Sequence, residues 1–76
     1  MSAPTTPIVA ETRRDSTYVA IAQWVDGERK VLAGFHAKNK GDRAKGAGIN
    51  EAGFVRWGDW IPNGYGWRTA TVRHAE

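Results

Sequence analysis

The chain has 76 residues, enough for one domain, and it has no cysteine, which excludes disulfides and thiolate metal sites. No stretch approaches the ~18 apolar residues of a membrane span, and the N-terminal residues lack the basic and apolar regions of a secretory signal. The formal net charge is +3. We expect a protein of the cytoplasm or of a virion, not one secreted by a signal peptide.

Residues 1–16 predict an extended N-terminal arm, because Pro4 and Pro7 disfavour helix at the residues before them and no helical pattern follows. The composition is equally typical of a disordered tail. The arm's candidate contacts with a partner protein are Pro4, Pro7, Ile8, Val9, Arg13 and Arg14. Residues 17–76 are expected to form a small β domain.

A hairpin is the clearest local signal. The β-prone runs "TYVAIAQWV" and "ERKVLAGFH" flank Asp26-Gly27, a preferred two-residue turn that fixes the register of the two strands. This register places Trp24 opposite Arg29 and continues along the strands to the pairs Ala22–Val31, Ile21–Leu32 and Tyr18–Phe35.

The segment "HAKNKGDRAKGAG", residues 36–48, is predicted to be a glycine-rich loop joining two hairpins. Four bases against the single acid Asp42 give it the whole net charge of +3. Such localised charge favours an anionic partner, and nucleic acid and an acidic protein surface both fit, as does a simple solvated connection. The candidate contacts are Lys38, Lys40, Arg43 and Lys45.

The runs "GFVRWGDWI" and "WRTATVRH" predict a second hairpin with a two-residue turn at Asn63-Gly64. Trp57 would then lie opposite Ala70 in the core, so that its replacement by alanine would be severely destabilising. Asp59 would pair with Arg68. A bulge at Gly58 would instead move Trp60 to the side of Trp57.

An aromatic surface is the second candidate contact region. In the predicted register Trp60 faces Trp67 on the side away from Trp57, next to two arginines. These rings would stack on bases, bury against a protein, or close a second side of the core. The candidate residues are Trp60, Trp67, Arg56 and Arg73.

The expected fold is all-β, with about four antiparallel strands in two hairpins that close as a barrel or a sandwich. No pattern predicts a long helix. His36 and His74 lack metal-ligand spacing, and no nucleophile motif surrounds Ser16. We therefore expect no enzymatic activity, no catalytic residue, no cofactor and no metal.

Three functions fit these features. The first is a non-enzymatic structural protein that docks on a larger assembly, such as the capsid of a viral or phage particle, through its arm and β domain; homo-oligomers also fit. Deletion of residues 1–14 would then abolish docking and leave the β domain folded. The second is a small basic nucleic-acid-binding protein that uses the 36–48 loop and the exposed tryptophans. The third is an inhibitor of a host enzyme.

Overall fold

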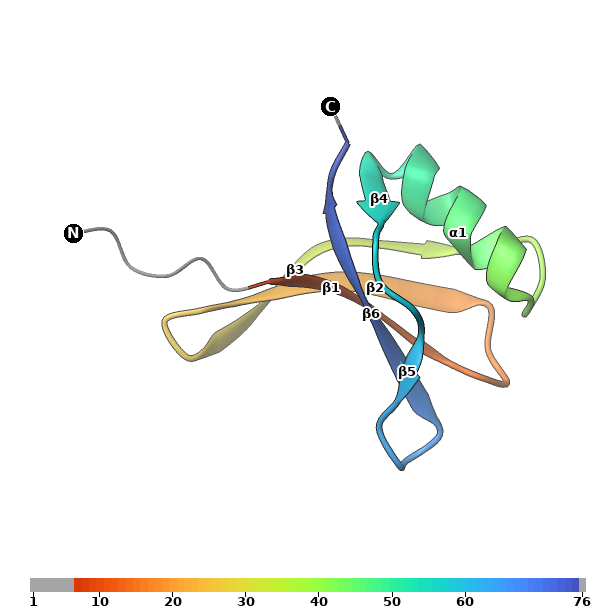
Figure 1. The fold of residues 1–76 in the computed structure, drawn as a ribbon, viewed down its shortest axis with the longest axis horizontal. Helices are drawn as coiled ribbons and strands as arrows, with labels where there is room; N and C mark the ends of the chain where they lie inside the picture. Colours follow the sequence, from red (N-terminus) through yellow and green to blue (C-terminus); the bar gives the residue numbers. More distant parts are fainter. Residues whose placement is uncertain (1–6, 76) are drawn as a thin grey trace.

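The computed structural model describes residues 7–75 and shows one antiparallel sheet of six strands and one helix (Figure 1). The strands are β1 (Ile8–Arg13), β2 (Tyr18–Val25), β3 (Glu28–His36), β4 (Phe54–Arg56), β5 (Ile61–Pro62) and β6 (Trp67–His74); helix α1 spans Asp42–Glu51. The strand order is β3-β2-β1-β6-β4, and β5 also pairs with β6. The predicted antiparallel β class is confirmed. The prediction of about four strands closing into a barrel or sandwich is wrong, because the sheet stays open with β3 at one edge and β4 at the other.

Strand β1 lies in the middle of the sheet, so the prediction of an extended arm over 1–16 is wrong for residues 8–13. Ala10 pairs with Ile21 of β2 on one side and with Ala70 of β6 on the other, and it is fully buried. Thr12 is also fully buried, and its hydroxyl donates a hydrogen bond of 2.7 Å to the Tyr18 carbonyl. The strand was not recognised because a small and a polar residue occupy its core positions.

The first hairpin forms with the predicted turn. Asp26 and Gly27 have φ of 52° and 79°, as a two-residue turn that follows the strand twist requires. The predicted pairs are confirmed as far as Ala22–Val31. A β-bulge then shifts the register by one residue, so that Ile21 pairs with Ala33 and Tyr18 with His36, and the pairs Ile21–Leu32 and Tyr18–Phe35 are wrong.

The prediction of a loop over residues 36–48 is wrong from Asp42 onward, where the ten-residue helix α1 begins. Lys45 and Ile49, four residues apart, are both fully buried beneath one face of this helix. Gly48 has a packing function, since a Cβ there would overlap the ring of Phe35 on β3. The glycines that indicated a loop thus include one that the contact between helix and sheet needs.

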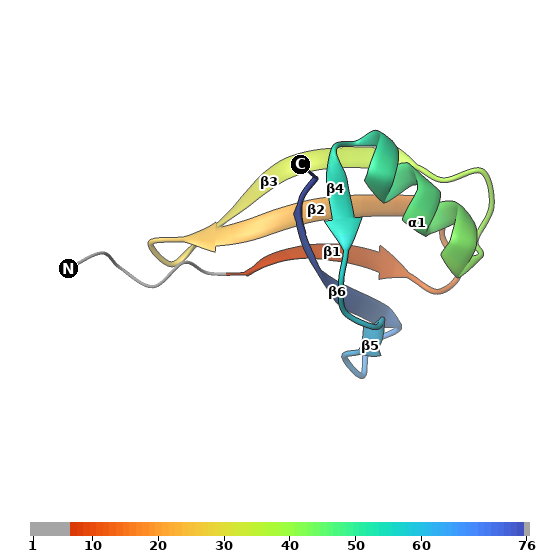
Figure 2. The same cartoon turned by 45° about the horizontal axis from the view of Figure 1, so that its top comes forward.

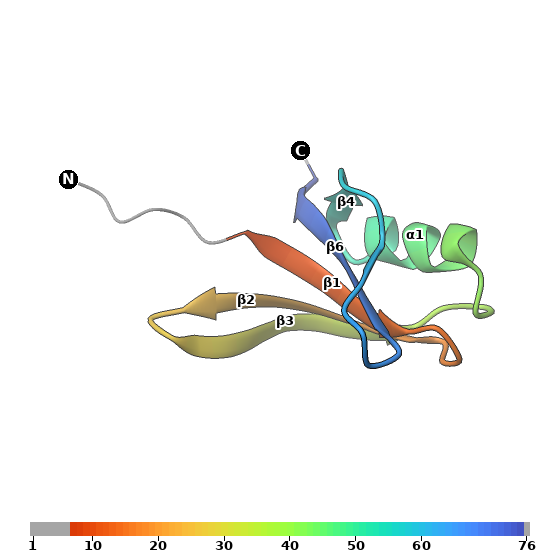
Figure 3. The same cartoon turned by 60° about the horizontal axis from the view of Figure 1, so that its bottom comes forward.

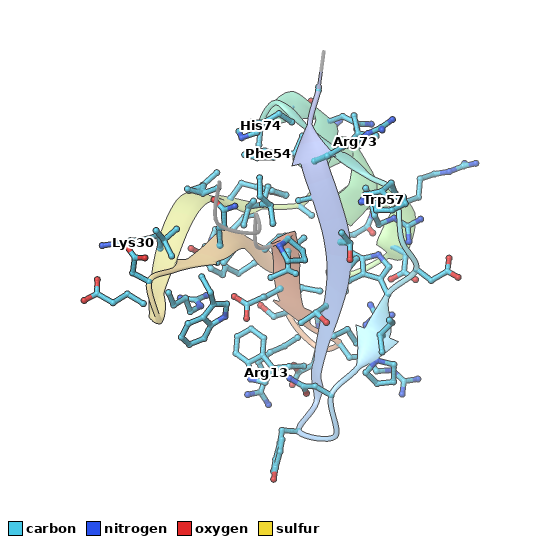
Figure 4. All side chains as sticks on the ribbon, turned by 60° about the vertical axis from the view of Figure 1, so that its left-hand side comes forward. Arg13, Lys30, Phe54, Trp57, Arg73 and His74 are labelled. Carbon is cyan, nitrogen blue, oxygen red and sulfur yellow. The ribbon has the colours of Figure 1, made fainter. Side chains whose placement is uncertain are left out.

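The second hairpin has a different register from the predicted one. Asn63 N–H donates to the Trp67 carbonyl at 3.0 Å, so the turn contains three residues, Gly64 to Gly66. Trp57 and Gly58 both donate to the Thr71 carbonyl, an irregularity that places Trp60 against the core and leaves Trp57 68% exposed. The predicted burial of Trp57 is therefore wrong, and Figure 4 shows its side chain pointing away from β6.

The core lies between α1 and the face of the sheet that α1 covers, as Figure 2 shows. Most of its members are of medium size, and Trp60 packs against its margin. Beyond the core, the β2–β3 hairpin extends away from the body of the molecule (Figures 1 and 3). The buried cluster comprises Ala10, Val19, Ile21, Ile49, Phe54 and Val72.

Candidate functional site

Three connections meet at the end of the sheet opposite the β2–β3 turn. Ala37 N–H, in the β3–α1 connection, donates to the Thr17 carbonyl in the β1–β2 turn at 2.8 Å. Arg14 N–H donates to the Gly66 carbonyl in the β5–β6 turn at 3.2 Å. Figure 1 shows the first two connections together on the right-hand side. Segments far apart in the sequence thus form one continuous surface.

This surface gathers most of the positive charge of the chain, and we call its charged residues the basic end. It carries seven basic and two acidic side chains, a net charge of +5, whereas the other residues carry four basic and six acidic ones, a net charge of −2. The sequence placed the excess in one segment, but the β1–β2 turn, helix α1 and strand β6 also contribute to it. The basic end comprises Arg13, Arg14, Asp15, Lys38, Lys40, Asp42, Arg43, Lys45 and Arg68.

Lys45 holds the basic end together from inside. Its side chain is fully buried, and Nζ donates a hydrogen bond of 2.9 Å to the carbonyl of Arg13, where β1 ends. Burial lowers the pKa of Lys45, the nearby Arg68 lowers it further, and Asp42 and Asp15 act in the opposite direction. Lys45 therefore joins α1 to β1, and it is not available as a contact for an anion.

Arg68 links β6 to the first turn of α1. Its Nη2 lies 2.7 Å from Asp42 Oδ1, and its guanidinium carbon lies 5.7 Å from the centre of the Trp60 ring. Arg56 lies over the same tryptophan at 6.0 Å. The predicted pair of Arg68 with Asp59 is thus replaced by a pair with Asp42. Trp60 packs between the core and two arginines.

Four cations of the basic end remain accessible to a ligand. Each is exposed and has no ion pair within residues 7–75, whereas Arg13 pairs with Asp15 at 3.5 Å. They come from two connections and the first turn of α1. The free cations are Arg14, Lys38, Lys40 and Arg43.

Two aromatic side chains, Tyr65 and Trp67, lie at the β5–β6 turn, where the Gly66 carbonyl accepts the hydrogen bond from Arg14 N–H. Tyr65 is 84% exposed between Gly64 and Gly66, whose positive φ of 91° and 80° sets the shape of the turn. Trp67 is half-buried, and the Arg13 guanidinium lies 5.6 Å from the centre of its ring. Figure 4 shows Arg13 near this turn. The sequence contained the signal for Tyr65, an aromatic residue between two glycines, but the predicted two-residue turn left it out.

The other predicted contact residues lie elsewhere. Pro4 is outside the described residues, and Pro7 is exposed just before β1. Ile8 and Val9 are partly buried within the sheet, paired with residues of both β2 and β6, and they do not extend as an arm. Arg73 is exposed on β6, and the two arginines that lie over the Trp60 ring are Arg56 and Arg68.

The two histidines make local contacts with different residues. His36 Nδ1 lies 3.0 Å from the hydroxyl of Thr17, and the His74 ring packs against Phe54 with centroids 4.8 Å apart, as Figure 4 shows. Within residues 7–75 no group of three or more His, Cys, Asp or Glu side chains has the arrangement of a metal site. No helix in the same range is long and apolar enough to cross a bilayer.

Comparison with protein-family models, with curated proteins and with solved structures finds no match for this chain.

Proposed function

We propose that this protein binds nucleic acid through the basic end, without catalysing a reaction. The observation that carries the proposal is the charge separation between the basic end at +5 and the rest of the chain at −2. A protein that neutralises phosphates gains affinity from the release of counterions, and this gain requires accessible cations held close together. Arg14, Lys38, Lys40 and Arg43 meet that requirement.

The aromatic residues favour a nucleic acid over other polyanions. Tyr65 extends from the same surface and is almost fully exposed, so it is free to stack on a base. Base stacking on an aromatic ring contributes roughly 1–3 kcal/mol and requires unpaired bases. We therefore expect single strands to bind more tightly than duplexes of the same length.

The test compares two double variants with the same change of charge. Lys38→Ser with Lys40→Ser removes two free cations of the basic end, and Lys30→Ser with Arg73→Ser removes two exposed cations outside it. Fluorescence anisotropy with a labelled single strand over a range of salt concentrations is expected to show a large loss for the first pair only. For the variant with Lys38→Ser and Lys40→Ser, the slope of log affinity against log salt is expected to decrease by about 1–2 units.

A quadruple variant extends the same measurement. Replacement of Arg14, Lys38, Lys40 and Arg43 by serine is expected to reduce the slope of log affinity against log salt by up to about 3–4 units. Tyr65→Ala is expected to weaken single-strand binding without changing this slope. Equal losses in the two double variants, or no binding by the wild type at low salt, would show the proposal to be wrong.

A second candidate function is docking on a protein assembly, the role of a capsid or other structural protein. A different region favours it, the β2–β3 hairpin, where four large apolar side chains are between 41% and 54% exposed. Of these, Trp24 and Val31 lie on the same face of the hairpin, because Val31 pairs with Ala22, two residues from Trp24. Exposed apolar groups that lie together mark surfaces for protein contact. Co-sedimentation of the wild type and of Trp24→Ser with a candidate assembly tests this function. We expect the variant to bind less than the wild type, and equal binding of the two proteins would contradict the proposal. The four side chains are Trp24, Val25, Val31 and Leu32.

A further inference from the structure

The sheet has one face that no helix covers within residues 7–75, since α1 lies against the other face. Side chains alternate between the two faces of a strand, so Glu11, which follows the buried Ala10, belongs to this second face, which we call the open face. Glu11 pairs with Ala20 there, and two residues further along β1 Arg13 pairs with Trp67. The open face therefore runs from the middle of the sheet to the basic end.

An ion pair between Glu11 and Arg29 crosses the open face. Arg29 Nε and Nη2 both donate to Glu11 Oε1, at 3.0 and 2.5 Å. Because β2 lies between β1 and β3, the Arg29 side chain must extend over β2 to reach Glu11, and it thereby helps to bury Ala22, which is 1% exposed. The second carboxylate oxygen of Glu11, Oε2, accepts no hydrogen bond from residues 7–75.

A hollow lies beside this ion pair on the open face. Its volume is about 460 Å³, and ligand sites in proteins have volumes of about 300–1,000 Å³. Trp67 is half-buried, and Asn63 lies opposite it, since Asn63 N–H donates to the Trp67 carbonyl at 3.0 Å. The hollow thus combines an aromatic ring with three hydrogen-bonding side chains from separate parts of the chain. Its lining residues are Glu11, Arg29, Asn63 and Trp67.

The hollow has no excess charge, unlike the basic end next to it. The Glu11 carboxylate and the Arg29 guanidinium neutralise each other, and the other two lining residues in the described chain are uncharged. A phosphate group therefore gains little from binding in the hollow itself. A neutral planar ring fits better, because Trp67 offers a surface for stacking and the polar side chains offer partners for the edge of the ring.

The polar groups of the hollow favour bases that carry an amino group. Glu11 Oε2 is an acceptor only, and Asn63 Oδ1 already accepts from Tyr65 N–H at 3.2 Å, which leaves the Asn63 amino group as a donor. Cytosine, adenine and guanine each donate from an amino group, which matches the carboxylate oxygen. Thymine and uracil instead have a ring N–H between two carbonyl oxygens, and these oxygens would lie against the carboxylate.

The hollow adjoins the basic end at Trp67. The Arg13 guanidinium lies 5.6 Å from the centre of the Trp67 ring, and Arg14 N–H donates at 3.2 Å to the carbonyl of Gly66, the residue before Trp67. A nucleic-acid strand whose phosphates contact these arginines therefore has a base within reach of the hollow. Only an unpaired base has its ring and its edge free to enter.

We propose that this hollow binds one base of a single-stranded nucleic acid, with the base stacked on Trp67 and its amino group donating to Glu11 Oε2. The inference rests on the proposed function, because the basic end holds the neighbouring phosphates. It adds a preference among bases, which phosphate contacts by themselves do not supply.

Nucleosides test the hollow without the basic end, because they carry no phosphate. Deoxycytidine and thymidine are titrated into isotope-labelled protein, and the indole N–H signal of Trp67 is followed by nuclear magnetic resonance. We expect deoxycytidine to shift this signal and to bind roughly tenfold more tightly than thymidine, as one hydrogen bond to a charged group provides.

Two variants assign the binding to the stacked ring and the carboxylate. Glu11→Gln keeps the size of the side chain but presents an amide that both accepts and donates, so we expect about equal affinities for the two nucleosides. Trp67→Leu removes the stacking surface and is expected to weaken deoxycytidine binding by about tenfold, followed through backbone signals of Glu11 and Asn63. The matched control is Trp57→Leu, which changes an exposed tryptophan outside the hollow and is expected to bind like the wild type. Circular dichroism verifies that each sheet is intact.

Oligonucleotides then connect the hollow with the basic end. Short deoxycytidine strands are expected to bind more tightly than thymidine strands of the same length. Glu11→Gln is expected to remove this preference without changing the slope of log affinity against log salt. Lys38→Ser with Lys40→Ser is expected to do the opposite, reducing the slope and keeping the preference.

Three results would overturn the inference. They are a wild type in which neither nucleoside shifts the Trp67 signal or both bind equally, a Glu11→Gln variant that keeps the full preference, and equal losses in Trp67→Leu and Trp57→Leu. A failure of the basic end has a different signature, an unchanged salt slope in the variant with Lys38→Ser and Lys40→Ser. The nucleoside titrations do not depend on that slope, so the two proposals fail separately.

Discussion

Trp57 and Trp60 are three residues apart, yet they have different environments because the chain is irregular at Gly58. Trp57 is 68% exposed, whereas Trp60 packs against the core between two arginines. We expect Trp57→Ala to change the free energy of unfolding by less than about 0.5 kcal/mol. Trp60→Ala is expected to lower it by about 2–3 kcal/mol, because it empties part of the core margin. Urea denaturation of both variants measures this difference, and similar losses would contradict the assigned burial.

The single buried residue Lys45 makes the free energy of unfolding depend on pH. Its folded pKa lies below the usual value of 10.5, so between the two values the unfolded chain binds more protons than the folded chain. The contribution of Lys45 to the free energy of unfolding therefore rises as the pH increases through the interval between the folded and unfolded pKa values. The Lys45→Met variant lacks the group and provides the comparison.

We expect the free energy of unfolding of the wild type to increase relative to Lys45→Met as the pH is raised towards 10.5. Denaturation curves of both proteins at each pH measure this difference, in which the titration of all other groups cancels. A constant difference between the two proteins would show that burial does not lower the pKa of Lys45.

Helix α1 contains two glycines with opposite roles. A Cβ at Gly46 would meet nothing, whereas a Cβ at Gly48 would overlap the Phe35 ring. Gly46→Ala is expected to raise the free energy of unfolding by about 0.5–1 kcal/mol through helix propensity. Gly48→Ala gains the same propensity but forces Phe35 to move, and we expect a net loss of about 1–2 kcal/mol. Thermal melting of the pair tests this, and stabilisation by both changes would mean that Phe35 moves freely.

Strand β1 is the element on which the sheet depends, since it joins β2 to β6. Deletion of residues 1–14 removes it completely, so we expect the shortened chain to be unfolded by circular dichroism. This reverses the expectation from the sequence that the β domain would survive the deletion. A chain lacking residues 1–6 is the control, because that deletion removes none of the described strands. Native-like spectra for both shortened chains would contradict the central position of β1.

For the whole molecule, the charge is separated between the basic end at +5 and the other residues at −2. A short single strand should therefore bind at one place on each chain. Titration calorimetry with a short oligonucleotide at low salt is expected to give one site per chain, both in the wild type and in the variant with Lys30→Ser and Arg73→Ser. More than one site per chain in the wild type would show that cations outside the basic end also bind.

The sequence by itself determined the local features of this protein. The antiparallel β class, the Asp26-Gly27 turn and the first four pairs of the β2–β3 hairpin depend on propensity and on contacts between neighbours in the chain. The excess of basic side chains over acidic ones in residues 36–48 is also a property of composition. These features need no knowledge of distant segments.

Only the tertiary structure decided the rest. Residues 8–13 become a strand because β2 and β6 lie on both sides of them, although their own pattern is weak. Residues 42–51 become a helix because the sheet buries Lys45 and Ile49 and accepts Gly48 against Phe35. The basic end exists because the β1–β2 turn meets the β3–α1 connection, which brings Arg14 to the side of the sheet that carries Lys38 and Lys40. Long-range burial outweighs local propensity at each of these places, and a local pattern does not record it.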